Sequence, residues 1–393
     1  MKTLNVTEFY SERGGGVRSH LTQKGHISCQ LGHEPVVVAP GPRDSEERFA
    51  GGARVIRIAG PSLPYDPTYH LLWRVDKVRE VIRRERPDVL EMDSPYVAAA
   101  SALSMPRSAF GIRTFVWHAD FIDTYLRTAL ERRMTPRAAA VLVEPLWAMV
   151  RRIARGCDAT FVAGRWMAEK LRGHGLERVW HLPFGVERAR FVPAARDPQL
   201  RRALLGRGKE GASLFVGVGR FAIEKRWDVV LDAFVAYTRQ RDAVLVLYGD
   251  GPERAALEAR VNGRDDVRFM GFERDRDRLA ASLASADALV HGCPFETFGF
   301  AVAEAMSVGL PVVVPSEGGA AELADDASAE RYAPGDAAAC ARAMERLIER
   351  ERVDREGMRR SALRAAEAIV SVEQQFALTY EAYRELLARR RAG

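Results

Sequence analysis

The sequence predicts an α/β protein with two Rossmann-like, doubly wound lobes that face a cleft. Three observations predict this fold class. In both halves of the chain, short apolar runs alternate with polar or glycine-rich turns and with segments of helical period. A stretch rich in Pro and Gly, residues 183–212, separates the two halves. The length of 393 residues also suits two domains.

Each half supplies its strands as short apolar runs. In the first half these runs are residues 4–9, 35–39, 55–58, 89–92, 114–117 and 159–163. In the second half they are residues 214–219, 244–248, 267–270, 288–291 and 311–314. Apolar runs of this length, bounded by turn signals and alternating with helical segments, are typical of a parallel sheet.

The last segment, residues 372–391, has helical spacing of its apolar residues, and no strand follows it. We therefore expect an N-terminal lobe over residues 1–190, a C-terminal lobe over residues 191–371 and a terminal helix. Ligands of open α/β sheets bind outside the carboxyl ends of the strands. A protein with two such lobes is expected to hold its substrates between the loops at those ends.

Charge and cysteine content narrow the possible partners. The net charge is +6, but the cations are mostly Arg and lie among acids rather than in runs, which argues against a nucleic-acid partner. For the terminal Arg389, Arg390 and Arg391, a solvated helix end is favoured over contact with an anionic membrane. The four Cys lack the spacing of zinc sites, and we expect them to be reduced.

No targeting segment is evident in the sequence. Glu8 interrupts the apolar N-terminus too early for a secretory signal, and no uncharged stretch of about 18 residues follows. The expected location is cytoplasmic, and a peripheral position at the inner membrane face stays open.

A glycine loop, residues 14–16, follows the first predicted strand and precedes a helix. Backbone amides at such a helix start can approach an anion closely, so Gly15 and Gly16 are candidate donor-binding residues. A tight strand-to-helix turn is the equally weighted alternative.

Residues 214–227 place Arg220 and Lys225 at the mouth of a buried strand. An Arg forks onto two oxygens and a Lys acts as a compact charge, so this pair can clamp a diphosphate. The competing interpretation is a partial dinucleotide fingerprint starting at Gly217. This interpretation fails for two reasons. Charged residues stand where the fingerprint needs close packing of the helix, and the next acid, Asp250, lies farther along the chain than the fingerprint requires.

Asp250 lies in a turn after the next strand, where the usual interpretation is a turn and nothing more. It is also a donor-binding candidate, because it would lie beside the loop that contains Arg268 and Phe269. In that loop a nucleobase could stack or meet backbone groups.

The strongest signal is the segment 286–323. A strand ends at His291, a loop carries Glu296, and a helix begins near residues 297–300 and ends at Gly309. Glu296 and Glu304 are eight residues apart, so we expect them on one side of this element. Glu296 could accept hydrogen bonds from sugar hydroxyls. Glu304 lies among apolar residues, where an unpaired carboxylate is costly, and could accept hydrogen bonds from ribose hydroxyls. Helix-start amides could stabilise a phosphate; they belong to Phe298, Gly299 and Phe300.

Two further groups of residues could form an active site or a metal site. His118 and Asp120 follow the strand 114–117, and although a lone His is more often structural, this position at a strand end favours the active site. His291 and Cys293 do not make a metal site, because two ligands are too few. The acids Asp275 and Asp277 could suggest a metal motif, but they are expected at the start of a helix. No metal is predicted.

Taken together, these motifs resemble the retaining glycosyltransferase family 4, of GT-B architecture. The resemblance rests on GGG (14–16), GRFAIEKR (219–226), GDGP (249–252) and above all ETFGFAVAE (296–304) with the GLPVVV and GG that follow. It covers nearly the whole chain. WHADF (117–121) is similar to a run in some mannosyltransferase-like members.

The resemblance implies a nucleotide-diphosphate-sugar donor in the C-terminal lobe and a lipid or glycan acceptor in the N-terminal lobe. It implies no metal or other cofactor, and a final helix that returns to the first lobe. Arg220 and Lys225 match the family's diphosphate clamp, and His118 its active-site His near the donor sugar. Glu296 matches its sugar-contacting Glu and Glu304 its ribose Glu. The chain departs from the family where Arg18 follows the glycine loop, and Arg18 and Asp120 are the acceptor-side candidates.

Three hypotheses follow. The first is a retaining transferase that moves a hexose from GDP-mannose or a UDP-hexose, with α linkage. The second is another GT-B-like enzyme, a nucleotide-sugar epimerase or a phosphorylase. The third is a non-catalytic protein that binds nucleotide-sugars.

Overall fold

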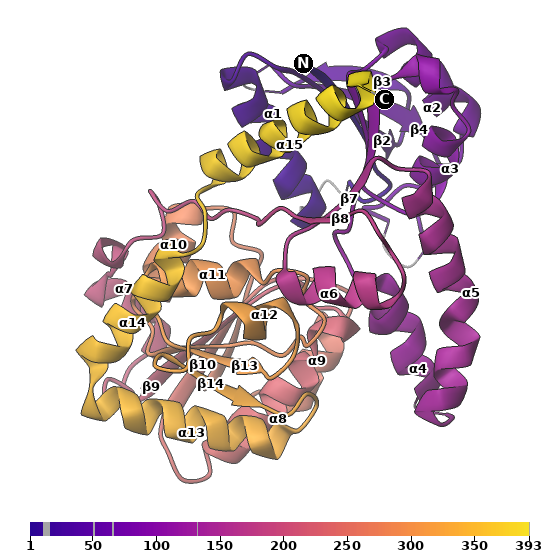
Figure 1. Ribbon diagram of the computed structural model, residues 1–393. Helices are drawn as coiled ribbons and strands as arrows, with labels where there is room; N and C mark the ends of the chain where they lie inside the picture. Colours follow the sequence, from indigo (N-terminus) through magenta and orange to yellow (C-terminus); the bar gives the residue numbers. More distant parts are fainter. Residues whose placement is uncertain (11–15, 50–51, 65–66, 132, 393) are drawn as a thin grey trace. The chain divides into compact units, whose positions relative to one another are not determined.

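The computed structural model describes residues 1–10, 16–49, 52–64, 67–131 and 133–392, and it divides into two compact units (Figure 1). Unit 1 comprises Met1–Pro183 together with Val372–Gly393, and unit 2 comprises Phe184–Ser371. Each unit is built around one sheet with helices on it, so the predicted α/β class with two doubly wound lobes is confirmed.

The sheet of unit 1 has the strand order β3-β4-β2-β1-β5-β6-β7-β8. Its strands pair in parallel except for β3, which runs antiparallel to β4. The strands are β1 (Lys2–Val6), β2 (Glu34–Gly41), β3 (Ser45–Arg48), β4 (Arg54–Ala59), β5 (Val89–Met92), β6 (Ile112–Val116), β7 (Ala159–Val162) and β8 (Val179–His181).

The helices of unit 1 cover both faces of this sheet. They are α1 (Gly16–Gln30), α2 (Val75–Glu85), α3 (Val97–Leu103), α4 (Thr128–Glu131), α5 (Pro136–Arg155), α6 (Arg165–Gly173) and α15 (Val372–Ala392), with a π-helical segment at Ile122–Arg127.

Helix α15 returns to unit 1, as the resemblance implies (Figure 1, yellow). Its residues Tyr380 and Tyr383 are fully buried against strands β5 and β6. The Tyr383 hydroxyl donates to Glu91 and accepts from Lys24 at 2.8 Å, so a buried polar cluster joins α15 to β5 and α1. Buried groups of this kind are stable because each has a partner.

The sheet of unit 2 is parallel throughout its described pairings, in the order β11-β10-β9-β12-β13-β14. Counted from β9, this is the 3-2-1-4-5-6 order of dinucleotide-binding folds. The strands are β9 (Ser213–Val218), β10 (Ala243–Tyr248), β11 (Val267–Gly271), β12 (Ala288–Val290), β13 (Val312–Pro315) and β14 (Ala329–Tyr332).

The helices of unit 2 bury both faces of its sheet. Along β9, Leu214 and Val216 belong to one hydrophobic cluster and Phe215 to another, which explains why this strand is apolar at successive positions. The helices are α7 (Pro198–Leu205), α8 (Trp227–Tyr237), α9 (Arg254–Val261), α10 (Arg276–Ala284), α11 (Phe300–Ser307), α12 (Gly318–Leu323), α13 (Ala337–Val353) and α14 (Arg355–Glu367).

Every apolar run named from the sequence overlaps a strand, but three strands of the described part of the chain were missed. Strand β3 is polar and mostly exposed, β8 has three residues, and only the ends of β14 are buried. The strand order reverses between β1 and β5 in unit 1 and between β9 and β12 in unit 2. Ligands of such sheets bind outside the carboxyl ends of the strands at these switch points.

Candidate active site

The switch point of unit 2 brings together Lys225, His291 and Glu296. The Lys225 ammonium donates to Glu296 Oε1 at 2.5 Å, and His291 Nε2 lies 3.3 Å from the same oxygen. Burial opposes ionisation of Glu296, but Lys225 and His291 prevail and hold the pKa of its carboxyl well below the ordinary value. Burial lowers the pKa of Lys225, but its negative neighbours, Glu296 first among them, outweigh burial, so the pKa is raised. This cluster therefore consists of an ammonium and a carboxylate at physiological pH.

Two glycine positions explain how the cluster forms. A Cβ at Gly292 would lie 2.6 Å from the Lys225 carbonyl oxygen, so only glycine lets these two backbones approach so closely. A Cβ at Gly319 would lie 2.6 Å from the Phe298 carbonyl oxygen, and its amide donates to the Glu296 carbonyl at 2.7 Å. The glycines that follow ETFGFAVAE therefore pack α12 against the loop that carries Glu296.

The same cluster offers three atoms with metal-ligand chemistry. One atom each of His291, Cys293 and Glu296 lies within 4.8 Å of the other two. Burial raises the pKa of the Cys293 thiol to about 12. The Lys225 ammonium already supplies a cation to the carboxylate. These residues fit an ion pair better than a metal site.

Glu304 lies in helix α11 and has a different partner. Its side chain is 8% exposed, and Arg276 Nη2 donates to its Oε1 at 2.5 Å. Burial raises the pKa of Glu304, and Arg276 works against that rise. The Arg276 guanidinium also lies 4.9 Å from the centre of the Phe191 ring. Glu304 is thus a buried carboxylate with one firmly held oxygen.

Glu296 lies in a loop and the helix that follows starts within residues 297–300, as predicted, but helical spacing does not relate Glu296 to Glu304. Helix α11 begins at Phe300, and Gly299 before it has φ 104°, so Glu296 lies in the preceding loop. Phe298 and Phe300 contact each other, with ring centres 5.1 Å apart, and Phe184 stacks on Phe300 at 5.5 Å. The eight-residue spacing therefore reflects a loop followed by a helix.

The acids that flank Arg276 begin helix α10, as expected from the sequence. Asp275 Oδ1 accepts from the amides of Asp277 at 2.9 Å and Arg278 at 3.2 Å. Sequence reasoning missed Arg276 itself. No local pattern pairs it with Glu304, 28 residues away.

Two other donor-side candidates follow strands β9 and β10. Arg220 is half-buried, and its carbonyl accepts from the Trp227 indole at 2.9 Å. Asp250 is exposed, and its carboxylate accepts from the Gly251 amide at 2.8 Å. A Cβ at Gly249 would lie 1.9 Å from the Gly219 carbonyl oxygen. The GDGP turn is therefore required for packing, whatever else it does.

Arg268 and Phe269 lie in strand β11, as the apolar run 267–270 predicts. The loop that the donor-binding hypothesis placed around them is therefore wrong. The Arg268 guanidinium donates to the carbonyls of Ala203 at 2.9 Å and Leu205 at 3.0 Å, which caps the end of α7. Phe269 packs edge-on against Phe221, with ring centres 5.7 Å apart. The side chain of Arg268 thus has a structural role.

The switch point of unit 1 holds His118 beside an acid that sequence reasoning missed. His118 Nε2 lies 2.7 Å from Asp93 Oδ1, and Asn5 Nδ2 donates to Asp93 Oδ2 at 2.9 Å. Asp93 is 2% exposed, so its carboxylate fixes the orientation of the His118 ring. The sequence could have indicated Asp93 as a site residue, because it directly follows the predicted strand 89–92.

Glu8 follows β1 at the same end of this sheet. Its Oε1 accepts from the Ala98 amide at 2.7 Å. Burial, with a smaller contribution from Asp93, raises the pKa of its carboxyl to about 7, although backbone amides oppose this. A carboxyl that titrates near neutral pH at a switch point is a candidate for function.

The acceptor-side candidates and the glycine loop are only partly described. Asp120 is buried, accepts from Lys170 at 2.5 Å, and has a pKa raised by burial; Lys170 also binds Asp123. The Arg18 guanidinium lies 5.5 Å from the centre of the Tyr10 ring. Gly16 begins α1, and a Cβ there would contact no atom within 4 Å. Gly15 lies outside the described residues.

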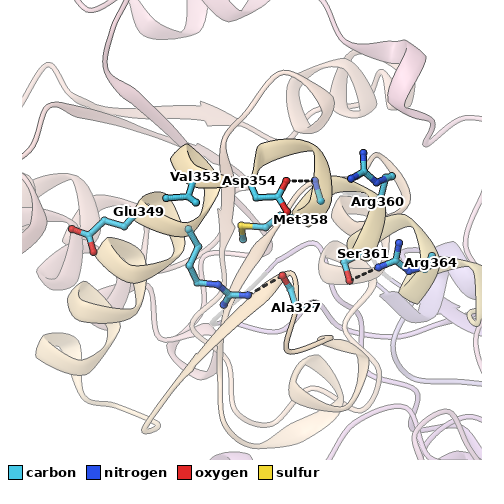
Figure 2. A pocket seen from close by; sticks show the side chains of 10 residues that line it. Ala327, Glu349, Val353, Asp354, Met358, Arg360, Ser361 and Arg364 are labelled. Atoms are coloured by element: carbon cyan, nitrogen blue, oxygen red, sulfur yellow. Dashed lines mark hydrogen bonds between the residues drawn. The ribbon is translucent and has the colours of Figure 1, made fainter.

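A pocket of about 660 Å³ lies beside the amino end of β14 and the junction of α13 and α14, and none of the candidate site residues lines it (Figure 2). Figure 2 shows hydrogen bonds between some of its lining residues. Arg350 donates to the Ala327 carbonyl at 2.8 Å, and Asp354 accepts from the Gly357 amide at 2.8 Å as the cap of α14. This pocket is a packing feature of the helix junction.

Two observations concern membranes. Among the described residues, no helix combines the length and the apolar character needed to cross a bilayer. At the end of α15, Arg389 pairs with Glu385 at 2.5 Å and Arg390 donates to the Arg107 carbonyl at 2.8 Å. These two arginines are bound to the protein itself, which supports the interpretation of a helix end.

Family models match both halves of the chain. A model described as Glycosyltransferase Family 4 matches residues 14–190, and one described as Glycosyl transferases group 1 matches residues 212–350. A GDP-mannose-dependent alpha-(1-6)-phosphatidylinositol dimannoside mannosyltransferase of Mycobacterium tuberculosis is 30% identical over 315 residues, covering 80% of this chain and 79% of that protein. A GDP-mannose-dependent alpha-mannosyltransferase of Corynebacterium glutamicum is 28% identical, covering 83% and 75%.

Solved structures share the fold at low sequence identity. The sucrose-phosphate synthase of Thermosynechococcus elongatus superposes with a TM-score of 0.79 at 18% identity, and 99% of each chain is covered. Anabaena HepE in complex with UDP and glucose superposes with a TM-score of 0.69 at 18% identity, covering 97% of this chain and 99% of that one.

Proposed function

This chain belongs to the glycosyltransferases described by the Family 4 and group 1 models, and we propose that it transfers mannose from GDP-mannose to a hydroxyl of a lipid or glycan acceptor, with retention and α linkage. The contact between Lys225 and Glu296 at the unit 2 switch point carries the proposal. The choice of donor is supported by the relatives, whose names specify GDP-mannose.

The chemistry begins with the bond between the sugar and the diphosphate. As this bond breaks, negative charge grows on the leaving phosphate, and cationic donors held in place beforehand stabilise it. Lys225 and Arg220 supply the positive charge that stabilises the leaving phosphate, and the amides near Phe298 to Phe300 add hydrogen-bond donors. Because Lys225 is already held by Glu296, little reorganisation is needed when the donor binds.

The remaining polar residues of unit 2 orient the donor. Glu296 accepts hydrogen bonds from hydroxyls of the sugar. Glu304, whose carboxylate Arg276 holds in place, accepts hydrogen bonds from the ribose hydroxyls. The leaving phosphate takes the proton of the acceptor hydroxyl on the face that it vacates, which retains the configuration. His118, which matches the active-site His of the family, is oriented by Asp93.

The reaction proceeds without a metal ion in this proposal. The charge of the diphosphate is balanced by Arg220, Lys225 and the helix amides rather than by a divalent cation. Metal-dependent transferases use the cation for the same purpose.

A donor panel tests the proposal. Thermal unfolding and sugar release are measured with UDP-, GDP- and ADP-sugars; a ligand at 100 times its Kd stabilises by about 2.7 kcal/mol. We expect GDP-mannose to give the largest shift and to transfer mannose when an acceptor is present. Conversion of the donor to an epimer, or sugar phosphate formed only with free phosphate, identifies a different GT-B-like enzyme. Tight binding without transfer or hydrolysis identifies a non-catalytic binding protein.

A further inference from the structure

Two exposed aromatic rings stand beside Glu8 at the unit 1 switch point. Phe9 is 38% exposed and Tyr96 is 45% exposed, and their ring centres lie 6.2 Å apart in an edge-on arrangement. Tyr96 also meets Phe121 edge-on at 5.8 Å. These contacts hold Tyr96 from two sides while much of its surface stays accessible. Aromatic side chains with an apolar face and a polar tip are suited to binding sites.

The Glu8 carboxyl has one oxygen engaged and one without a partner. Oε1 accepts from the Ala98 amide at 2.7 Å, whereas Oε2 is shielded from solvent and has no hydrogen-bond partner among the described residues. Such an atom is costly unless a ligand satisfies it, so it calls for an explanation. The titratable groups that interact with this carboxyl are Asp93 and Tyr96.

We propose that Glu8, Phe9 and Tyr96 form the acceptor subsite, and that the acceptor group is a polyhydroxylated ring, a sugar or a cyclitol. This inference rests on the proposed function, because it assigns the class of acceptor for that reaction. A ring of this class presents C–H groups to an aromatic face and hydroxyls at its edge. The rings of Phe9 and Tyr96 contact the C–H groups, and Glu8 Oε2 accepts from a hydroxyl.

The observations favour a ring over a simple lipid alcohol. A hydroxyl on a flexible acyl glycerol needs one hydrogen-bond acceptor, but it has no rigid C–H face for the two aromatic rings. A ring uses both features of the site. Free sugars and cyclitols share this chemistry with the same ring on a lipid, so soluble rings serve as probes.

The first experiment compares acceptors. Radiolabelled GDP-mannose is incubated with the wild-type protein and with methyl α-mannopyranoside, myo-inositol or dioleoylglycerol in micelles. We expect transfer to at least one ring probe and slower or no transfer to dioleoylglycerol. Transfer to dioleoylglycerol with none to either ring overturns the inference.

The second experiment uses Glu8→Gln, Phe9→Leu and Tyr96→Leu. We expect the KM for the ring probe to rise about tenfold in each, the loss of about one good contact, while the KM for GDP-mannose changes less than twofold. Glu47→Gln and Trp73→Leu are matched controls, because they change an exposed acid and an exposed aromatic ring elsewhere in unit 1. Equal KM values for wild type and all three variants overturn the inference.

A binding measurement separates this inference from the proposed function. Saturation-transfer NMR detects contact of methyl α-mannopyranoside or myo-inositol with the protein in the absence of any donor. We expect contact with the wild type and its loss in Tyr96→Leu. If GDP-mannose is neither bound nor consumed, the proposed function fails, while this result still decides the ring subsite. Contact that persists in Tyr96→Leu and Glu8→Gln overturns the subsite.

Discussion

At the scale of single residues, the site depends on how each carboxyl is paired. Glu296 has the Lys225 ammonium at 2.5 Å, which keeps its pKa low although the group is largely buried. Glu8 Oε1 accepts from the Ala98 amide, and burial raises the pKa of this carboxyl to about 7. The same side-chain chemistry therefore gives a permanent anion in unit 2 and a titrating group in unit 1.

Replacing Lys225 removes a preorganised donor. We predict that Lys225→Ala lowers kcat by two to three decades, because losing one such donor typically costs about 2.7 to 4 kcal/mol of barrier. Turnover of GDP-mannose measures the effect, and Lys209→Ala, which breaks the exposed pair with Asp265 instead, is the control. A kcat within tenfold of wild type removes Lys225 from the diphosphate clamp.

Glu8 makes the stability depend on pH. Its pKa rises from 4.5 to about 7 on folding, so between these values the unfolded chain loses the proton first. The wild type should therefore lose stability relative to Glu8→Gln as pH rises from 4.5 to 7, by up to about 3 kcal/mol. Urea unfolding at pH 5 and pH 8 measures this difference. A difference that does not change with pH shows that the carboxyl is not desolvated.

At the scale of elements, helix α15 is joined to unit 1 by the cluster of Lys24, Glu91 and Tyr383. The Tyr383 hydroxyl contacts both charged groups, and all three side chains are buried. Tyr380, one turn earlier, is equally buried, but its hydroxyl has no partner among the described residues. The two tyrosines thus form a matched pair with and without a polar contact.

We predict that Tyr383→Phe destabilises the protein by about 1 to 3 kcal/mol, since buried polar groups lose a partner. Tyr380→Phe should be close to neutral, because no hydrogen bond is removed. The free energy of unfolding in urea measures both. Equal effects of the two substitutions would mean that ring packing, and not the polar cluster, holds α15.

Apolar patterning predicts the central strands, because they are buried on both faces and are apolar at successive positions. It does not predict β3, whose residues are polar or charged and which pairs with β4 at the edge of the sheet. It places Glu296 correctly in the loop before α11, but helical spacing does not relate Glu296 to Glu304. The helix starts only at Phe300, after Gly299 adopts a left-handed conformation that apolar spacing does not reveal.

At the scale of the whole molecule, motifs identified the parts of the site but not their partners. Arg276 and Glu304, Asp93 and His118, and Lys170 and Asp120 are paired through the fold, across 28, 25 and 50 residues. Local spacing carries no signal for such contacts. It did place Lys225 and Glu296 at strand ends, and the 3-2-1-4-5-6 order of unit 2 explains why those ends meet.

The reaction as a whole should be insensitive to chelation. Lys225 supplies the cation next to Glu296. We expect millimolar EDTA to leave the transfer rate within twofold of its value without chelator. Loss of activity in EDTA that Mg²⁺ or Mn²⁺ restores would show that a metal takes part.

The anomeric configuration of the product is the most direct test of the proposed reaction. The measurement is NMR of the product formed from GDP-mannose labelled with ¹³C at the anomeric carbon, with methyl α-mannopyranoside as acceptor. The one-bond carbon–proton coupling at that carbon distinguishes α from β linkage. We predict an α-linked product, because the acceptor attacks the face that the diphosphate leaves. A β-linked product would contradict retention, and with it the proton transfer assigned to the leaving phosphate.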